Sequence, residues 1–212
     1  ASDMHSGHFG NFTPNAALEL AQLLASFKDR EGNVVVPGFY EGIPSLSDKE
    51  IQAMRAVPQI EGDLKNQFGI RKTEREGTLQ DLINQPTFNI RGLQAGYVGA
   101  KASNIIPAKA EASIDVRLVT GMDPPRIFNA VKEHITRQGF HVSESDPSVE
   151  ELRTYGPTVV LNRKGYFNAV KTDMTAALPA RVLSNIQRGT SEPWVIEPSE
   201  GGSLNFEVFK DL

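Results

Sequence analysis

The clearest pattern in this sequence is found in Ala108-Lys109-Ala110-Glu111-Ala112-Ser113-Ile114-Asp115-Val116-Arg117-Leu118. Apolar residues occupy every second position, and charged or hydroxyl-bearing residues occupy the positions between them. A period of two is typical of a β-strand with one buried face and one polar face. We therefore predict a strand over residues 108–118 that lies on a packed core.

Further elements are expected on both sides of this strand. A weaker strand precedes it, with Phe88, Ile90 and Leu93 as its apolar positions. Asp123 and the two prolines after it predict the start of a helix, which Gly139 ends in a left-handed conformation. A strand over residues 141–145 is expected next. The apolar face of the helix consists of Ile127, Phe128, Val131 and Ile135.

The first part of the chain predicts a helix, a strand and an excursion. Thr13-Pro14 is a helix-start signal, and an apolar stripe at helical spacing follows it toward Lys28 and Gly32. Val34–Val36 is expected to form a short strand. Residues 37–78 have no sustained periodicity, apart from a helix expected over Ser47–Met54, and Thr78 is expected to cap a short helix through Asn84. The stripe consists of Leu20, Leu23, Leu24 and Phe27.

This order of elements predicts an α+β fold. We expect a two-layer sandwich in which two helices cover one face of a four-stranded antiparallel sheet, as in ferredoxin-like domains. Residues 1–160 would form this domain, with an irregular excursion at about 37–84.

The end of the chain has too few apolar residues for a core of its own. Thr158–Leu161 is apolar, Asp173–Arg188 is expected to be a helix, and Trp194–Ile196 a short strand. Gly201-Gly202-Ser203 follows. We interpret residues 161–212 as a fragment of a second, catalytic α/β domain.

Composition excludes several classes of protein. The 212 residues have a net charge of −4, which provides no electrostatic reason to expect a nucleic-acid partner or an anionic membrane. No apolar run reaches the roughly 20 residues that a membrane span needs. The absence of cysteine excludes disulfides and thiolate metal sites but does not determine the compartment, for which the cytoplasm is our expectation.

The most informative motif is Asp3-Met4-His5-Ser6-Gly7, followed by Phe9-Gly10. It places an imidazole at the edge of a tight, glycine-flanked turn, where a partner can reach it. His8 shares the turn, so the motif alone leaves open which histidine is functional. A lone histidine near a turn is usually a solvated surface residue.

These residues, taken with others in order along the chain, resemble the lid, or dimerisation, domain of the M20 family of metallopeptidases, in its carnosinase-like dipeptidase branch. The resemblance covers nearly the whole chain. The other matching segments are Val36-Pro37-Gly38-Phe39-Tyr40, Pro86-Thr87-Phe88-Asn89-Ile90 with Gly92, Ile106-Pro107 leading into Asp115-Val116-Arg117-Leu118-Val119, and Gly201-Gly202-Ser203.

The resemblance implies roles for individual residues. His5 would reach across a homodimer and donate a hydrogen bond to the oxyanion in the neighbouring subunit's site. Asn104 and Arg117 would contribute to substrate or transition-state binding. The turn containing Gly202 and Ser203 would hold the terminal carboxylate of the substrate.

The resemblance also implies a dinuclear-zinc amidohydrolase or exopeptidase acting on dipeptides or acyl-amino acids. The family's metal ligands have no match in this sequence, so we expect them before residue 1 and after residue 212, and we expect this chain alone to be inactive. A non-catalytic dimerisation module, a small-metabolite-binding module and a member that has lost its metals are the alternatives.

Each site residue also has an ordinary structural interpretation. Arg117 on the polar face of a strand would by default pair with Glu111 or Asp115. Asn104 would be a turn residue, and Gly201-Gly202-Ser203 would be simply a turn. His134 and His141 are interpreted as packing and structural residues.

Overall fold

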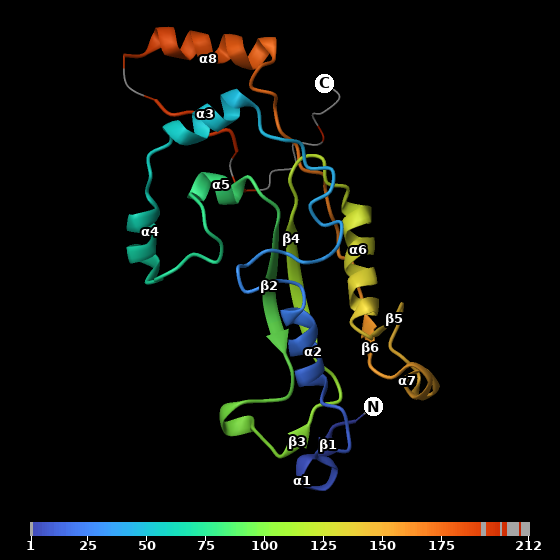
Figure 1. Ribbon diagram of the computed structural model, residues 1–212. Coiled ribbons are helices and arrows are strands. Elements are labelled where there is room, and N and C mark those ends of the chain that lie inside the picture. The colour runs from blue at the N-terminus through green and yellow to red at the C-terminus, as the bar shows by residue number, and fades with distance from the viewer. Residues whose placement is uncertain (1, 192–193, 200, 203–207, 209–212) are drawn as a thin grey trace. The chain divides into compact units, whose positions relative to one another are not determined.

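The computed structural model describes residues 2–191, 194–199, 201–202 and 208. The chain divides into two compact units. Unit 1 comprises residues 1–39, 87–117 and 125–165, and unit 2 comprises residues 40–86, 118–124 and 166–212. The helices and strands are shown in Figure 1.

Unit 1 contains three short ladders among its described residues. β1 (Met4–His5) pairs antiparallel with β3 (Ile105–Ile106), and β2 (Thr87–Gln94) pairs antiparallel with β4 (Glu111–Arg117). β5 (His141–Ser143) and β6 (Thr158–Val160) pair parallel. The α+β class is therefore confirmed, with small antiparallel sheets and helices. These ladders do not join into one four-stranded antiparallel sheet, so the sandwich with that strand count stays a prediction.

The strand with the clearest alternation is present and shorter than expected. β4 begins at Glu111 rather than Ala108, and its partner β2 has an irregularity between Ile90 and Gly92. Val34 and Val36 are buried around an exposed Val35, as alternation predicts, but only a single bridge between Lys28 and Val34 forms there, so a regular strand was the wrong expectation.

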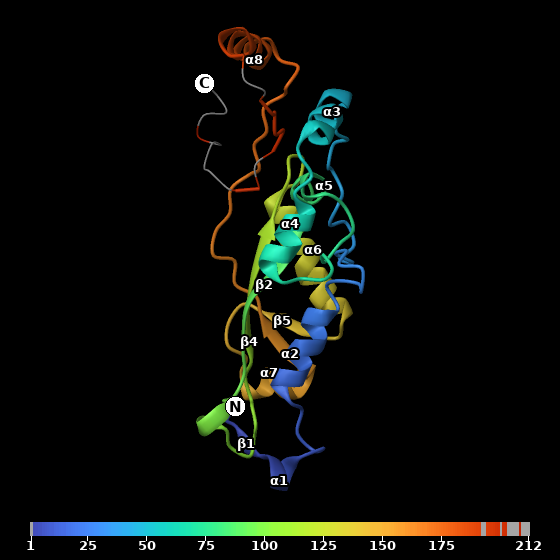
Figure 2. The ribbon, with the colours of Figure 1, turned by 90° about the vertical axis from the view of Figure 1, so that its left-hand side faces the viewer.

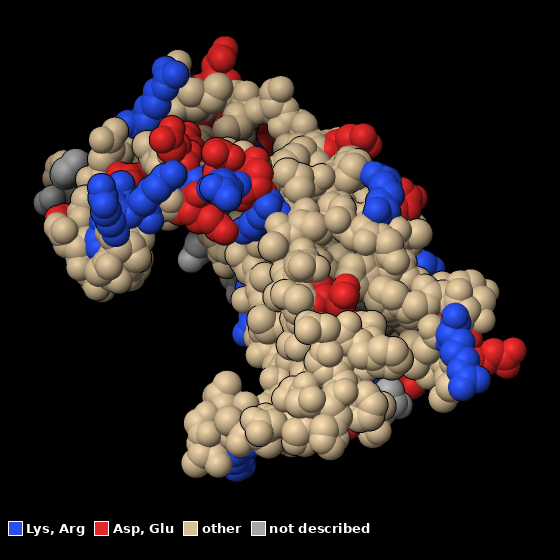
Figure 3. Space-filling model, turned by 60° about the horizontal axis from the view of Figure 1, so that its bottom comes forward, with Lys and Arg blue, Asp and Glu red and all other residues tan. Residues whose placement is uncertain are grey.

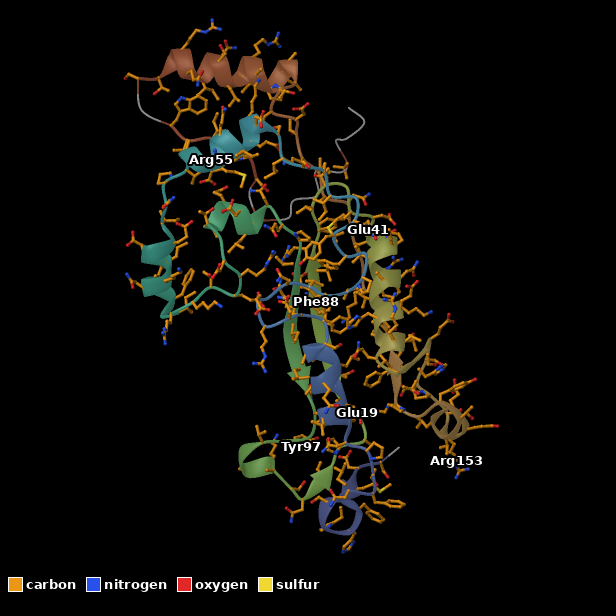
Figure 4. The ribbon with its side chains drawn as sticks, in the orientation of Figure 1. Glu19, Glu41, Arg55, Phe88, Tyr97 and Arg153 are labelled. Carbon is orange, nitrogen blue, oxygen red and sulfur yellow. The ribbon has the colours of Figure 1, made fainter. Side chains whose placement is uncertain are left out.

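The core of unit 1 joins two helices to the β2–β4 ladder. Phe27, after α2 (Ala16–Ala25), is 2% exposed and its ring stacks on Phe88 of β2 with centroids 4.6 Å apart. The same ring contacts His134 of α6 (Pro124–Arg137) at 4.9 Å. Both helices lie on one side of the ladder in Figure 2, and Phe88 is labelled in Figure 4. The other buried apolar residues of unit 1 are Leu23, Leu24, Val34, Val36, Phe39, Ile106, Ile127, Val131 and Ile135.

Helix boundaries follow local capping. α2 begins two residues after Pro14 because the side chain of Asn15, not of Thr13, accepts hydrogen bonds from the N–H groups of Ala17 and Leu18. The helix ends at Ala25, before the expected end near Lys28. α6 begins at Pro124 and is followed by Gly139 at φ 92°, as predicted.

Unit 2 contains four helices among its described residues. α3 (Asp48–Ala56) and α5 (Leu79–Ile83) were predicted, and each begins with a capping box, from Ser47 and from Thr78. α8 (Ala177–Gly189) begins four residues later than expected, and residues 194–196 form no strand with other described residues. α4 (Glu61–Phe68) was not predicted.

The remaining elements of unit 1 are short. α1 covers Ser6–Phe9, η1 is a 3-10 turn at Gly99–Lys101, and α7 covers Val149–Tyr155. No helix among the described residues is long and apolar enough to cross a membrane.

Candidate functional site

His5 lies at one end of unit 1, where two distant parts of the chain are paired. In the β1–β3 ladder, Met4 is opposite Ile106 and His5 is opposite Ile105. The backbone N–H of Ser6 donates a hydrogen bond to the carbonyl oxygen of Asn104 at 2.9 Å. The ladder therefore brings together two of the site residues expected from the sequence, His5 and Asn104, and both are exposed.

Asp3 ties this ladder to the start of the next strand. Its Oδ1 accepts a hydrogen bond from the backbone N–H of Ala108 at 3.0 Å. Ile106, which pairs with Met4 in the ladder, is buried, with 6% of its surface exposed. The segment before His5 is thus attached to the core through a carboxylate and a paired strand. The role of Asp3 was not predicted, although Asp3 opens the motif, because its partner lies 105 residues away.

One ring nitrogen of His5, Nδ1, has a hydrogen-bond partner on the backbone of the same turn. The backbone N–H of Gly7 donates a hydrogen bond to Nδ1 at 3.1 Å. Because Nδ1 is the acceptor, the neutral ring carries its proton on Nε2. His5 is an exposed residue.

Two glycines make this geometry possible through their size. A Cβ on Gly7 would lie 3.1 Å from Cε1 of His5 and 3.3 Å from Nδ1. A Cβ on Gly10 would lie 2.7 Å from the carbonyl oxygen of Ser6, which accepts the hydrogen bond that closes α1. A side chain at Gly10 would displace the turn that carries His5, and a side chain at Gly7 would press on the His5 ring.

His8 lies against His5. Their ring centroids are 4.6 Å apart with an interplanar angle of 32°, and Phe9 contacts the His8 ring edge-on at 6.2 Å. The sequence left open whether His5 or His8 is functional. In the structure both belong to one ring cluster, and it is Nδ1 of His5 that accepts the Gly7 hydrogen bond.

This end of unit 1 carries few charges. Residues 2–15 and 95–109 contain only Asp3, Lys101 and Lys109 as charged side chains. Met4, Phe9 and Phe12 are exposed there, and so are Tyr97, labelled in Figure 4, and Val98. The lower part of Figure 3, which corresponds to this end, is accordingly mostly tan. Such a surface has a low desolvation cost when it meets another protein surface.

Arg117 lies at the opposite end of the β2–β4 ladder. It pairs with Thr87, whereas Glu111 at the start of β4 pairs with Gln94, from which the chain leads toward β3. At about 3.3 Å per residue, roughly 20 Å separates the two ends of β4. The structure therefore does not bring Arg117 to His5 within one chain. Nε of Arg117 donates to the Asp115 carboxylate at 2.8 Å, which is one of the ion pairs expected from the sequence.

The glycine-serine turn belongs to unit 2. Gly201 and Gly202 are exposed, and a Cβ on Gly201 would be 3.6 Å from the side chain of Ile83, while nothing lies within 4 Å of that position on Gly202. Ser203 lies outside the described residues.

The other two histidines have structural environments, as expected. His134 is 5% exposed, and its Nε2 lies 2.9 Å from Oγ of Ser26, which itself donates to the carbonyl oxygen of Leu23 at 2.7 Å. Burial lowers the pKa of His134, and the nearby Arg137 lowers it further. His141 stacks on Tyr155 with centroids 4.1 Å apart.

No group of three or more His, Asp or Glu side chains among the described residues is arranged to hold a metal ion. These residues do not fit a metal site, and we assign no chemical step to a metal on them.

Comparison with known proteins decides the family. A sequence profile of the M20 peptidase dimerisation domain matches residues 2–142. The chain belongs to this family. The matched range contains His5, Asn104 and Arg117, so the whole His5 end of unit 1 is part of the M20 dimerisation domain.

The relatives are named as dipeptidases. The chain is 26% identical over 141 residues to the Cys-Gly metallodipeptidase DUG1 of Candida albicans, covering 65% of this chain and 29% of the relative. It is 28% identical over 138 residues to human Beta-Ala-His dipeptidase, covering 64% of this chain and 26% of the relative. The M20 chain thus spans less than a third of the length of these relatives.

Solved structures agree on the fold. The M20 family metallo-carboxypeptidase Sso-CP2 from Sulfolobus solfataricus superposes with a TM-score of 0.77 at 23% identity, over 99% of this chain and 50% of that protein. The dipeptidase Dug1p from Saccharomyces cerevisiae superposes with a TM-score of 0.67 at 20% identity, over 100% of this chain and 42% of that protein.

Proposed function

We propose that this chain is the lid-bearing part of a dinuclear-zinc amidohydrolase or exopeptidase of the M20 type. The complete protein would hydrolyse dipeptides or acyl-amino acids, and its two zinc ions would be bound by residues outside this sequence. The lid would dimerise and supply His5 to the active site of the partner subunit. The family match and the metallodipeptidase relatives support this reaction class.

The hydrogen bond from Gly7 to Nδ1 of His5 is the observation that carries the proposal. Hydrolysis of an amide begins when water adds to the carbonyl carbon, and the carbonyl oxygen becomes an oxyanion. The Nε2–H of the exposed His5 is a donor suited to that oxyanion. The C–N bond then breaks and the amine leaves with a proton. Removing one preorganised oxyanion donor typically lowers kcat about 100- to 1000-fold.

The separation of His5 from Arg117 supports action in trans. An extended dipeptide spans at most about 7 Å, whereas the ladder between these residues is roughly 20 Å long. A site that uses both side chains on a dipeptide would therefore combine His5 of one protomer with Arg117 of the other. Asn104, whose carbonyl oxygen accepts the Ser6 N–H bond, would accompany His5.

In this proposal two groups are each suited to binding a carboxylate. The guanidinium of Arg117 presents a planar fork that matches a carboxylate. Gly202, which has no Cβ, and Ser203 would let backbone N–H groups and a hydroxyl approach the same kind of anion.

The outer edge of β2 is the surface we propose for dimerisation. Among the described residues β2 pairs only with β4, and residues 89–94 are all exposed. Ile90 is 49% exposed and Leu93 is 56% exposed on this strand, and Leu18 of α2 is 57% exposed. A strand whose outer edge has no partner among the described residues, and which carries exposed apolar side chains, is a template for pairing with a second copy, and two-fold symmetry would produce a continuous sheet.

The test is substitution of His5→Ala in the complete, metal-loaded protein. We expect kcat/KM for a dipeptide to fall about 100- to 1000-fold, with the metal content by elemental analysis unchanged. Unchanged turnover would show that His5 has no role in the reaction.

A further inference from the structure

The ring of His8 is the closest aromatic neighbour of the proposed oxyanion donor. His8 lies on α1, three residues after His5, and the two ring centroids are 4.6 Å apart with a tilt of 32°. Phe9 contacts the His8 ring edge-on, at 6.2 Å and 73°. Three consecutive rings therefore contact one another in the order His5, His8, Phe9.

The imidazole of His5 needs such neighbours because it is exposed. An exposed side chain samples several rotamers, and each alternative rotamer directs Nε2–H elsewhere. Gly7 restrains one part of the ring: its N–H bonds to Nδ1, and its Cα lies so close that an added Cβ would be 3.1 Å from Cε1. A single hydrogen bond at 3.1 Å still allows rotation about its own axis. The His8 ring restrains that rotation through its contact with the face of His5.

We propose that His8 is a positioning residue, whose ring holds the imidazole of His5 in the orientation that presents Nε2–H to the partner's active site. This inference rests on the proposed function of His5. The ring acts through its flat surface, so another planar side chain can replace it, whereas an aliphatic side chain of similar size cannot.

The expected effect follows from the strength of ring contacts. A pair of aromatic rings favours its contact geometry by a factor of about 2 to 10 in population. Since only the correctly oriented His5 stabilises the transition state, loss of the His8 ring lowers kcat by about the same factor, 2 to 10, and leaves KM unchanged.

The experiment compares four variants of the complete, metal-loaded protein: His8→Leu, His8→Phe, His5→Ala, and His141→Leu as a matched control. His141 also stacks on an aromatic ring, that of Tyr155, but outside residues 2–15 and 95–109. We expect His8→Leu to lower kcat 2- to 10-fold with KM, melting temperature and metal content unchanged. His8→Phe should restore the wild-type kcat and pH profile, and His141→Leu should leave kcat unchanged.

A spectroscopic measurement tests the same point without activity. In ¹⁵N-histidine spectra at high pH, His5 should be in the Nε2–H form in the wild type and in His8→Phe. In His8→Leu the fraction in the Nδ1–H form should rise.

The outcomes separate this inference from the proposed function. If His5→Ala lowers kcat and His8→Leu does not, the positioning role of His8 is wrong and the role of His5 stands. If His8→Phe is as slow as His8→Leu, His8 acts through its nitrogen atoms rather than its ring face, and the inference is also overturned. Wild-type turnover in His5→Ala contradicts the proposed function itself.

Discussion

The backbone N–H of Gly7 donates a hydrogen bond to Nδ1 of His5 at 3.1 Å, and a Cβ added to Gly7 would lie 3.1 Å from Cε1 of the same ring. One glycine thus determines which nitrogen of His5 carries the proton and limits how close the ring can come to the turn. Gly7 therefore contributes to the geometry of His5 in two ways: its N–H donates to Nδ1, and its lack of a Cβ leaves room for the ring.

Gly7→Ala is expected to lower kcat about 10-fold in the complete protein, because the new Cβ would lie 3.1 Å from Cε1 of His5 and displace the ring. Gly7 is exposed, so the melting temperature should change little. The control is Gly189→Ala, since nothing lies within 4 Å of the Cβ position there. Equal kcat in both variants would contradict the restraint that we assign to Gly7.

Charges on the outer edge of β2 are expected to dissociate the dimer. The double substitution Ile90→Lys and Leu93→Lys places two like charges on the proposed interface, and the same two on its symmetry mate. Analytical ultracentrifugation should then show monomers, and activity should fall with dissociation because His5 no longer reaches a partner's site. Val35→Lys, at a residue of unit 1 that is 46% exposed, should remain dimeric. A dimeric double variant would exclude this edge as the interface.

The ion pair between Glu50 and Lys171 predicts a stability effect in unit 2. Glu50 of α3 is 9% exposed and its carboxylate bonds to Lys171 and to Ser47. The hydrogen bond from Lys171, and next those from Ser47, lower the pKa of Glu50 from 4.5 to about 2. Because the pKa is lowered in the folded state, the contribution of Glu50 to the free energy of unfolding is fully present above pH 4.5. This contribution is lost as the pH falls from 4.5 toward 2.

Glu50→Gln should therefore lower the free energy of unfolding by about 1–3 kcal/mol at pH 7, with a smaller deficit at pH 3. Glu76→Gln, at an exposed residue, is the control and should change stability by less than about 0.5 kcal/mol. Denaturant titration measures both, and a deficit that does not shrink at pH 3 would contradict the assigned pKa.

Buried His134 in unit 1 also predicts that stability depends on pH, but here the cause is burial of the imidazole rather than an ion pair. Burial lowers its pKa below 6.5, so the unfolded chain binds a proton more readily than the folded chain does. The contribution of His134 to the free energy of unfolding is therefore fully present above pH 6.5 and decreases as the pH falls below 6.5. His134→Gln retains a donor for Ser26 and does not titrate. The melting temperature of the wild type should fall more than that of His134→Gln between pH 7.5 and pH 5.5; equal falls would show that His134 does not contribute.

The sequence predicted those parts of the fold that depend on local pattern. Strict alternation revealed β4, and the apolar stripe of α6 with Gly139 after it revealed that helix. Capping residues revealed α3 and α5. Ser148 and Glu151 form the same kind of capping box at α7, a helix that was not predicted.

Other elements depend on contacts that no local pattern encodes. α4 has no side-chain cap bond at its start. β1 and β3 are two residues each and exist because residues about 100 positions apart pair with each other. The motif singled out the turn with His5 and His8, but the contact between the two rings, the hydrogen bond from Ala108 to Asp3 and the separation from Arg117 emerge only when the ladders are assembled.

In the proposed dimer, His5 serves the partner's site while Arg117 serves the site of its own subunit. Mixed dimers of His5→Ala and Arg117→Ala subunits, purified with two different affinity tags, test it most directly. In such a dimer one site combines an intact Arg117 with an intact His5 from the partner, and the other site has neither. We predict that the mixed dimer regains about half of the wild-type activity, although each parent homodimer is nearly inactive. A mixed dimer as inactive as its parents would contradict delivery of His5 in trans.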